Sequence, residues 1–222
     1  QVSICDLDTA KGEELAKCLN GKYGSDVAIF NRCDVTDINS IRECFKATVA
    51  KFGQVDVLFN NAGIWDDSPT GWSRQVDINL KGPINGCIVA LEFMGSQNGG
   101  KGGTVISTAS YLAVSTFPIM PIYSATKAAV LSLTRSFGTP FHYELNKVKF
   151  MCLCPHATGT NLFKDMDKHF LVGSEKLTQL MKKLSENGKY QPYVHTFPLF
   201  PVCLFLNSFN YFKLCAKYRL FF

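Results

Sequence analysis

The sequence predicts the α/β class, a doubly wound parallel sheet covered by helices, and three observations support it. From Val2 to Cys154, short apolar runs alternate with longer amphipathic ones, as strands and their covering helices do. The chain has 222 residues, of which 46% are hydrophobic, enough for one sizeable core. Small or polar residues follow two of the apolar runs, where such sheets place ligands. We therefore expect one domain, at residues 1–190.

The individual elements follow from residue type and periodicity. Strands are expected at Val2–Asp6, Val27–Cys33, Val55–Asn60, Thr104–Thr108 and Lys149–Cys154, all rich in Val, Ile, Phe or Cys. Helices are expected at Thr9–Lys22, Ile38–Phe52, Trp72–Met94 and Tyr123–Glu144. Thr9 and Asp37 are suitable N-cap residues. The glycine-rich stretch Gly95–Gly103 is expected to be an exposed connection.

Composition excludes several classes of partner and setting. The net charge is +5, but Lys and Arg are scattered along the chain, so no nucleic-acid partner is expected. The nine Cys include no repeated CxxC pair. Cys152 and Cys154 alternate along a buried strand, where free thiols behave as small hydrophobes. This favours reduced thiols, a cytoplasmic protein and no metal site.

The two ends of the chain differ from the part between them. Beyond Gln191 the sequence is rich in Phe, Leu, Pro and Tyr without a helical or strand period, so residues 191–222 are interpreted as an atypical hydrophobic tail. Within it, Pro and Asn interrupt the apolar segment Thr196–Phe212, so no membrane anchor is expected. Gln1 leads directly into a strand without a visible signal peptide. The absence of an initial Met suggests that the true start lies upstream.

Tyr123 and Lys127 form the best local candidate for catalysis. A spacing of four places both side chains on one face of a helix. A Tyr hydroxyl has an ordinary pKa of about 10, so it needs a neighbouring cation, such as Lys127, to exchange a proton near neutral pH. The pair alone is weak evidence, because Tyr and Lys are common. The alternative interpretation is a solvated helix face.

Three other candidates are polar residues near the ends of strands. Ser110 follows the strand Thr104–Thr108, and its hydroxyl could hold a substrate oxygen. Asn60–Gly63 follows the strand before it, and its small residues would let the backbone approach a planar ring. Asn79 lies within a predicted helix, where Asn is mildly unfavourable and usually faces solvent.

Together these residues carry a resemblance to a known family. Asn60-Asn61-Ala62-Gly63, Asn79, Ser110, Tyr123 and Lys127 occur in the order and approximate spacing of the short-chain dehydrogenase tetrad. The resemblance covers about Val2 to Phe163. The phrases VDVLFNNAG, DINL and PIYSATKAAV are most similar to the prostaglandin dehydrogenase and insect alcohol dehydrogenase branches. It implies a Rossmann-like fold.

The resemblance also implies a role for each matching residue. Tyr123 would be the general acid/base, Ser110 would polarise the substrate oxygen, and Asn79 would seat a relay water. Lys127 would lower the pKa of Tyr123 and hold the nicotinamide ribose. Further cofactor contacts are implied for Asp6 and Asn61 at the adenosine ribose, Asp34 at the adenine, Gly63 in packing, and Thr158 and Thr160 at the carboxamide. Because Asp6 would repel a 2′-phosphate, NAD is expected rather than NADP. An ordinary turn-starting Asp is the alternative.

The chain departs from the family in three respects. The central first strand and its glycine-rich phosphate-binding turn are missing, and no GxGxxG sequence occurs. That strand would lie between the Val2 and Val55 strands, so its loss should open the sheet and expose unpaired backbone. His156 occupies a position suited to Gly, and we interpret it as a tolerated loop substitution. Met120 replaces a substrate-binding Gln, which makes the pocket wall more apolar.

Two functions remain open at this stage. The first is an NAD-dependent oxidoreductase that interconverts a small apolar secondary alcohol and a ketone, inactive in this truncated form. The alternative is a non-catalytic fragment or isoform that acts by dimerising with full-length relatives. In either case the helices Trp72–Met94 and Tyr123–Glu144 match the family's subunit interface, so a homo-oligomer is expected.

Overall fold

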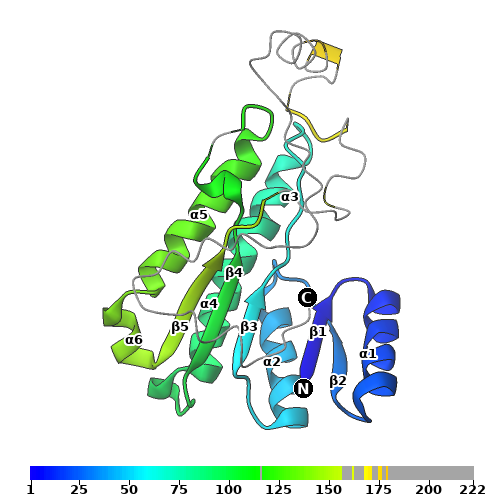
Figure 1. Cartoon of the computed structure of the whole chain (residues 1–222), viewed down its shortest axis with the longest axis vertical. Coiled ribbons are helices and arrows are strands. Elements are labelled where there is room, and N and C mark those ends of the chain that lie inside the picture. Colours follow the sequence, from blue (N-terminus) through cyan, green and yellow to red (C-terminus); the bar gives the residue numbers. More distant parts are fainter. Residues whose placement is uncertain (116, 157–161, 163–167, 172–174, 177–178, 180–222) are drawn as a thin grey trace.

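Parallel strands alternate with helices along the chain, as the sequence predicts (Figure 1). The computed structural model describes residues 1–115, 117–156, 162, 168–171, 175–176 and 179. The strands are β1 (Val2–Asp6), β2 (Ala28–Arg32), β3 (Val57–Asn60), β4 (Gly103–Thr108) and β5 (Val148–Leu153). The main helices are α1 (Thr9–Tyr23), α2 (Ile38–Phe52), α3 (Trp72–Val76), α4 (Gly82–Met94), α5 (Pro121–Phe137) and α6 (Pro140–Asn146). The predicted α/β class is confirmed.

The described strands form two parallel sheets rather than one. β1 pairs with β2, and β3, β4 and β5 pair in that order. The break between the two sheets lies between β1 and β3, which Figure 1 shows on opposite sides of it, with α2 nearby. Val57 and Phe59 of β3 are 42% and 37% exposed, although strands inside a parallel sheet are normally covered on both faces. The backbone of β1 and β3 that faces the break has no strand partner within the described residues.

Helices cover opposite faces of the β1–β2 pair. On one face, Thr48 of α2 donates to the Ser3 hydroxyl at 2.8 Å. On the other, Phe30 lies so close to α1 that a Cβ on Gly12 would approach its ring to 2.1 Å. Because successive side chains of a strand point to opposite faces, these contacts fix the orientation of the pair. The main core then joins α2 and α4 with β4 and β5 around the buried Phe45, Val105 and Phe150.

Two predicted helices are interrupted. The prediction Trp72–Met94 is divided by a π-helical turn, η1 (Asp77–Lys81). The prediction Tyr123–Glu144 ends at Phe137 and resumes at Pro140, because proline lacks an N–H and is tolerated only in a first helical turn. The same rule explains why α5 begins at Pro121, before the predicted start.

The predicted cap of α2 is confirmed, but that of α1 is wrong. Asp37 accepts a hydrogen bond from the Asn39 N–H. For α1, the cap is Asp8, whose carboxylate accepts from the Lys11 N–H at 3.1 Å. Thr9 is the first helical residue, so its hydroxyl is one position too late to cap the helix.

This correction gives a first prediction about stability. Asp8→Ala should lower the urea midpoint by about 0.3–0.5 M, because it removes the cap of α1. Thr9→Ala is the matched control and should leave the midpoint nearly unchanged. Equal effects of the two substitutions would contradict the assignment of Asp8 as the cap. Urea titrations followed by circular dichroism make the comparison.

Other predictions are addressed only by the part of the chain that the structure describes. Seven cysteines there are free thiols, including Cys152 and Cys154. No helix there combines the length and the hydropathy that crossing a membrane requires, and no group of acidic, Cys and His residues there could hold a metal ion. The predicted tail, residues 191–222, lies outside the described residues.

Candidate active site

The tetrad residues meet where β3 and β4 end and α5 begins. Ser110 follows β4, while Tyr123 and Lys127 lie on α5. Asn79 lies on η1. All four side chains are buried, with exposed fractions between 0% and 9%. The structure therefore brings together the residues that the sequence separates by up to 48 positions.

Tyr123 and Ser110 form the centre of this cluster. The Leu112 N–H donates to the Ser110 oxygen at 3.1 Å, which leaves the Ser110 hydroxyl proton free to be donated. Burial raises the pKa of Tyr123 to about 12, and a hydrogen bond with Ser110 opposes this rise by stabilising the phenolate. Tyr123 is therefore protonated at neutral pH in this arrangement.

Lys127 lies beneath the same site. Its ammonium donates to the Thr108 carbonyl oxygen at 2.9 Å and lies 5.6 Å from the centre of the Tyr123 ring. Burial lowers the pKa of Lys127 to about 8, since desolvation disfavours the charged form. The ammonium is thus largely charged at pH 7 and loses its proton within a mildly alkaline range.

The depressed Lys127 pKa predicts a pH-dependent stability. Between pH 8 and 10.5 the unfolded state binds more protons at this lysine than the folded state, so the free energy of unfolding rises with pH. Relative to Lys127→Met, the wild type should gain about 3 kcal/mol at most over that range. Urea unfolding at several pH values measures this gain. Lys101→Met, at an exposed lysine, is the control. The same dependence of the unfolding free energy on pH in Lys127→Met and Lys101→Met would contradict the prediction.

The burial of the pair, and not its spacing, distinguishes it from a second pair at the same spacing. Tyr143 and Lys147 are also four residues apart, and the Lys147 ammonium lies 5.4 Å from the Tyr143 ring centre. However, Lys147 is exposed and pairs with Glu144. Tyr143 and Lys147 are therefore the solvated surface pair that the spacing alone could not exclude.

Asn79 makes two backbone contacts that hold the loop after β3. Its Oδ1 accepts from the Ile64 N–H and its Nδ2 donates to the Ile64 carbonyl, both at 2.8 Å. Nδ2 also lies 3.4 Å from the Thr126 hydroxyl on α5. Asn79 lies within the π-helical turn, and such turns are frequent at functional sites. The expectation that a mid-helix Asn usually faces solvent is wrong here.

Gly63 packs closely against the cluster. A Cβ at this position would come within 3.3 Å of the Lys127 ammonium and 3.4 Å of Asn79 Oδ1. The missing side chain thus lets the backbone of the loop after β3 approach a cation and an amide.

Two of the predicted adenosine-side residues lie on the other sheet from the tetrad, and the third lies next to it. Asp6 ends β1, and its Oδ1 accepts from the Asp8 N–H at 2.9 Å, as in an ordinary turn. Asp34 follows β2 and accepts from the Thr36 N–H and hydroxyl, which lowers its pKa. Asn61 accepts from the Thr108 hydroxyl of β4 at 2.9 Å, and the Thr108 carbonyl accepts from Lys127.

Other predicted residues have different outcomes. Thr158 and Thr160 lie outside the described residues. His156 packs against Tyr111, with ring centres 5.0 Å apart. Met120 is 3% exposed and belongs to an apolar cluster with Trp65, Ile119 and Tyr123, bordered by Leu112, Phe117, Leu162 and Phe170. Met120 therefore packs beside Tyr123, and the apolar pocket wall stays a prediction.

Sequence reasoning missed three buried residues near the site. Trp65 packs with Tyr123, Asp67 accepts from the Tyr123 N–H, and Gln75 donates to Asp67. One signal could have indicated Asp67. The residue before Pro121 is Met120, which cannot cap a helix, so the first turn of α5 requires an acceptor from elsewhere.

Comparison with known proteins identifies the family. The sequence profile described as short chain dehydrogenase matches residues 1–170. The chain belongs to the short-chain dehydrogenase family. One relative, the 15-hydroxyprostaglandin dehydrogenase [NAD(+)] from Macaca fascicularis, is 29% identical to this chain over 173 residues. The matched region covers 78% of this chain and 64% of that protein. The chain thus spans less than two thirds of that relative's length.

Other short-chain dehydrogenases are similar to a comparable extent. Alcohol dehydrogenase 2 of Ceratitis capitata is 31% identical over 180 residues, 81% of this chain and 66% of that one. A family structure from Burkholderia phymatum in complex with NAD has a TM-score of 0.70 at 23% identity and covers 86% of this chain and 71% of that one. A 3-ketoacyl-(acyl-carrier-protein) reductase from Brucella melitensis complexed with NADH has a TM-score of 0.64 at 26% identity and covers 85% of this chain and 81% of that one.

Proposed function

We propose that this short-chain dehydrogenase interconverts a secondary alcohol and a ketone with NAD as cofactor. The observation that carries the proposal is the buried contact of Tyr123 with Ser110 and Lys127, where Gly63 also packs closely. A surface pair would have no such environment. Family membership supports the same reaction class, and the alcohol and prostaglandin dehydrogenases among its relatives support an alcohol substrate.

In this mechanism the protein holds the substrate oxygen and moves one proton. Ser110 donates a hydrogen bond to that oxygen. Tyr123 accepts the hydroxyl proton during alcohol oxidation and returns a proton during ketone reduction. Because the pKa of Tyr123 is raised to about 12, a basic phenolate becomes more populated as the pH rises, so oxidation should be faster at alkaline pH. NAD, when bound, accepts the hydride that leaves the carbinol carbon.

The residues proposed to hold the cofactor come from both sheets. Lys127, Tyr123 and Gly63 would hold its nicotinamide side, with Thr158 and Thr160 at the carboxamide. Asp6, Asp34 and Asn61 would hold its adenosine side. The positions of Asp6 at the end of β1 and Asn61 after β3 agree with the rule that ligands bind beyond the carboxyl ends of parallel strands.

Asp6 gives a prediction about cofactor choice. Its carboxylate should repel the 2′-phosphate of NADP, so NAD should be preferred. In the chain joined at its N-terminus to a phosphate-binding strand and turn, Asp6→Ser should reduce the preference for NAD, measured as the ratio of the NADP to the NAD dissociation constant, by about tenfold or more. Asp8→Ser, two residues later, is the control. An unchanged ratio in Asp6→Ser would show that this residue is only a turn residue.

The break in the sheet motivates a second part of the proposal. We propose that a strand and a glycine-rich turn between β1 and β3 complete the cofactor site, and that residues 1–222 alone are inactive. The exposed Val57 and Phe59 and the unpaired facing backbone of the described β1 and β3 support it. The sequence itself contains no GxGxxG motif for the pyrophosphate.

The proposed substrate is a small apolar alcohol or ketone. The side chains packed around Tyr123, including Trp65, Ile119 and Met120, are apolar. Such a wall favours a substrate with hydrocarbon next to the carbinol carbon. The free thiols in the described part also favour the predicted cytoplasmic setting.

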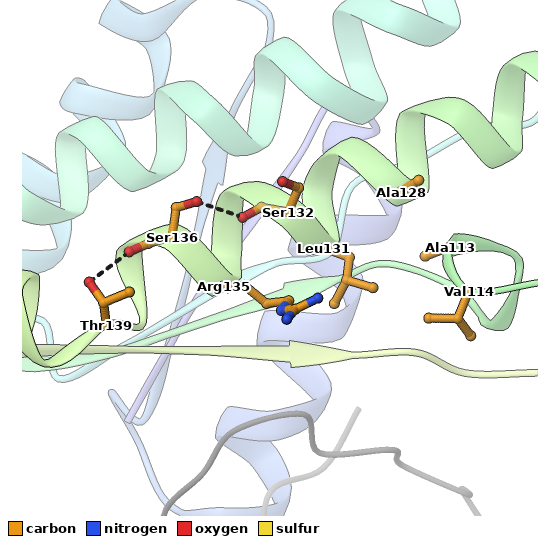
Figure 2. Close-up of a pocket in the computed structure, with 8 residues that line it drawn as sticks. All are labelled: Ala113, Val114, Ala128, Leu131, Ser132, Arg135, Ser136 and Thr139. Atoms are coloured by element: carbon orange, nitrogen blue, oxygen red, sulfur yellow. Dashed lines mark hydrogen bonds between the residues drawn. The ribbon is translucent and has the colours of Figure 1, made fainter.

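A second copy of the chain is the proposed protein partner. A hollow of about 520 Å³ lies on the outer side of α5, and none of its lining residues belongs to the tetrad. Figure 2 shows Leu131 and Arg135 of α5 on one side of it and Ala113 and Val114 on the other. Val114 is 53% exposed. Burying this surface in a homo-oligomer would cover exposed apolar area.

The alternative function, a non-catalytic chain that pairs with full-length relatives, is favoured by the same break in the sheet. Light scattering of the chain mixed with an intact relative distinguishes the two. A mixed species would support the alternative, and its absence would remove it.

The enzymatic proposal is tested by cofactor reduction. The chain, joined at its N-terminus to a phosphate-binding strand and turn, is incubated with NAD and a series of secondary alcohols of increasing apolar length. We expect absorbance at about 340 nm to rise, fastest for the more apolar alcohols. No NADH from any alcohol, with NAD bound, would contradict the proposed function.

A further inference from the structure

The first turn of α5 has no capping residue of its own. Met120 occupies the N-cap position without a side-chain hydrogen bond, and Pro121 has no N–H to satisfy. The N–H groups of Ile122 and Tyr123 are then first-turn donors without an acceptor inside the helix. Both donate to a single side chain from outside the helix. The Ile122 N–H donates to Asp67 Oδ2 at 2.8 Å and the Tyr123 N–H to Asp67 Oδ1 at 2.9 Å.

Asp67 is itself held rigidly. It is 0% exposed and comes from the loop between β3 and α3. Gln75 of α3, also fully buried, donates to Asp67 Oδ1 at 2.8 Å. The same Gln75 amide accepts from the Asp66 N–H at 2.7 Å. A buried acid of this kind is costly unless its acceptors are satisfied, and here three donors satisfy it.

The loop that carries Asp67 also carries Gly63. Gly63 borders Lys127 and Asn79, and Asn79 clamps Ile64 on both backbone groups. Asp67, four residues after Gly63 in the same loop, accepts a hydrogen bond from the backbone N–H of Tyr123. The loop after β3 therefore connects the residue proposed as acid/base to the side of the site proposed for nicotinamide, through hydrogen bonds at each end.

We propose that Asp67, braced by Gln75, is a positioning residue that fixes Tyr123 relative to Ser110, Asn79 and Gly63. This inference rests on the proposed function of Tyr123. Asp67 acts through the backbone N–H of Tyr123 and not through its phenol oxygen. Ordinary helix capping alone would need an acceptor for the two N–H groups, but not one in the loop that also packs against Lys127 and Asn79.

The test replaces Asp67 by Asn in the full chain. Asn has the same shape but only one acceptor oxygen, so an N–H donor would face an amide NH₂. Amide hydrogen exchange by NMR should show Ile122 and Tyr123 exchanging about tenfold faster or more, with the rest of α5 little changed. Asp66→Asn is the matched control. Asp66 is the neighbouring acid, which contacts Ser68 and His169 and not α5.

A second readout concerns the phenol. Its ionisation is followed by ultraviolet absorbance after a rapid jump to alkaline pH, as the difference between each protein and its Tyr123→Phe counterpart. The pKa of Tyr123, raised to about 12 by burial, should fall toward its ordinary value in Asp67→Asn, because a loosened first turn exposes the ring. It should not change in Asp66→Asn. Where turnover is measurable, kcat should fall about tenfold or more with little change in KM.

The possible outcomes separate this inference from the proposed function. Faster exchange and easier ionisation in Asp67→Asn support the positioning role, even if no alcohol is oxidised. Protected amides and an unchanged Tyr123 pKa would overturn it. If Asp67→Asn does not fold, Gln75→Met is tested instead, because it keeps the side-chain volume and leaves the Asp67 carboxylate in place. Smaller changes in the same direction in both readouts would support the positioning role. Wild-type behaviour of Gln75→Met in both readouts would overturn it.

Discussion

Replacing Tyr123 by Phe is expected to lower turnover at least about a hundredfold, within the range that general acid/base catalysis supplies. The substitution removes one oxygen and keeps the ring among Trp65, Ile119 and Met120, so the fold should be preserved. NAD affinity should fall far less than turnover, because Lys127 and Gly63 remain on the nicotinamide side. Steady-state kinetics at 340 nm, with the cofactor site completed by the proposed strand and turn, measure the loss.

Tyr143→Phe is the matched control for this prediction. Tyr143 has a lysine four residues later and a comparable distance between cation and ring, but it lies on the surface helix α6. Its replacement should leave turnover unchanged. If Tyr123→Phe also retained full turnover while binding NAD, the proposed mechanism would be wrong, and the buried cluster would have a structural role only.

The second large effect concerns cofactor affinity. Residues 1–222 alone should bind NAD weakly or not at all, even though the tetrad is assembled. The pyrophosphate would lack a glycine-rich turn, whose backbone N–H groups and helix dipole no other residue described above replaces. Three charge-assisted hydrogen bonds, at about 1.5–3 kcal/mol each, would weaken binding by several orders of magnitude if fully lost.

Isothermal calorimetry measures this affinity directly. The control is the same chain joined at its N-terminus to a strand and a GxxxGxG turn, which should bind NAD far more tightly. Micromolar binding to residues 1–222 alone would show that the strand proposed between β1 and β3 is not needed. Equal, weak NAD binding by both proteins would instead indicate that the assignment of Asp6, Asp34 and Asn61 to the adenosine side is wrong.

Elements whose stability is local could be predicted from the sequence. β1 and α2 have the predicted bounds, because each has a clear apolar pattern and a local cap or turn at its end. The tetrad could be assigned because its members follow strands or share a helix face, and parallel strands end at the same edge. The break between β1 and β3 could be anticipated once the family's strand order was taken into account.

Features that depend on distant contacts could not be predicted. The π-helical turn at Asn79 has no local signal, because it accompanies a pair of hydrogen bonds to Ile64, fifteen residues earlier. The difference between the buried pair Tyr123–Lys127 and the pair of half-buried Tyr143 and exposed Lys147 lies in packing and not in spacing. The role of Asp67 arises from an acceptor placed 55 residues before Ile122, in the first turn of the helix that it caps.

The central claim is that Tyr123 and its neighbours support hydride transfer from a secondary alcohol. Deuterium transfer tests it most directly. The chain with its cofactor site completed is incubated with NAD and a secondary alcohol deuterated at the carbinol carbon. Mass spectrometry then measures the deuterium content of the products. We predict deuterium in the reduced nicotinamide and an equal amount of ketone, with both products formed at least about a hundredfold more slowly by Tyr123→Phe. Bound NAD that gains no deuterium, or gains it equally with Tyr123→Phe, would contradict the account.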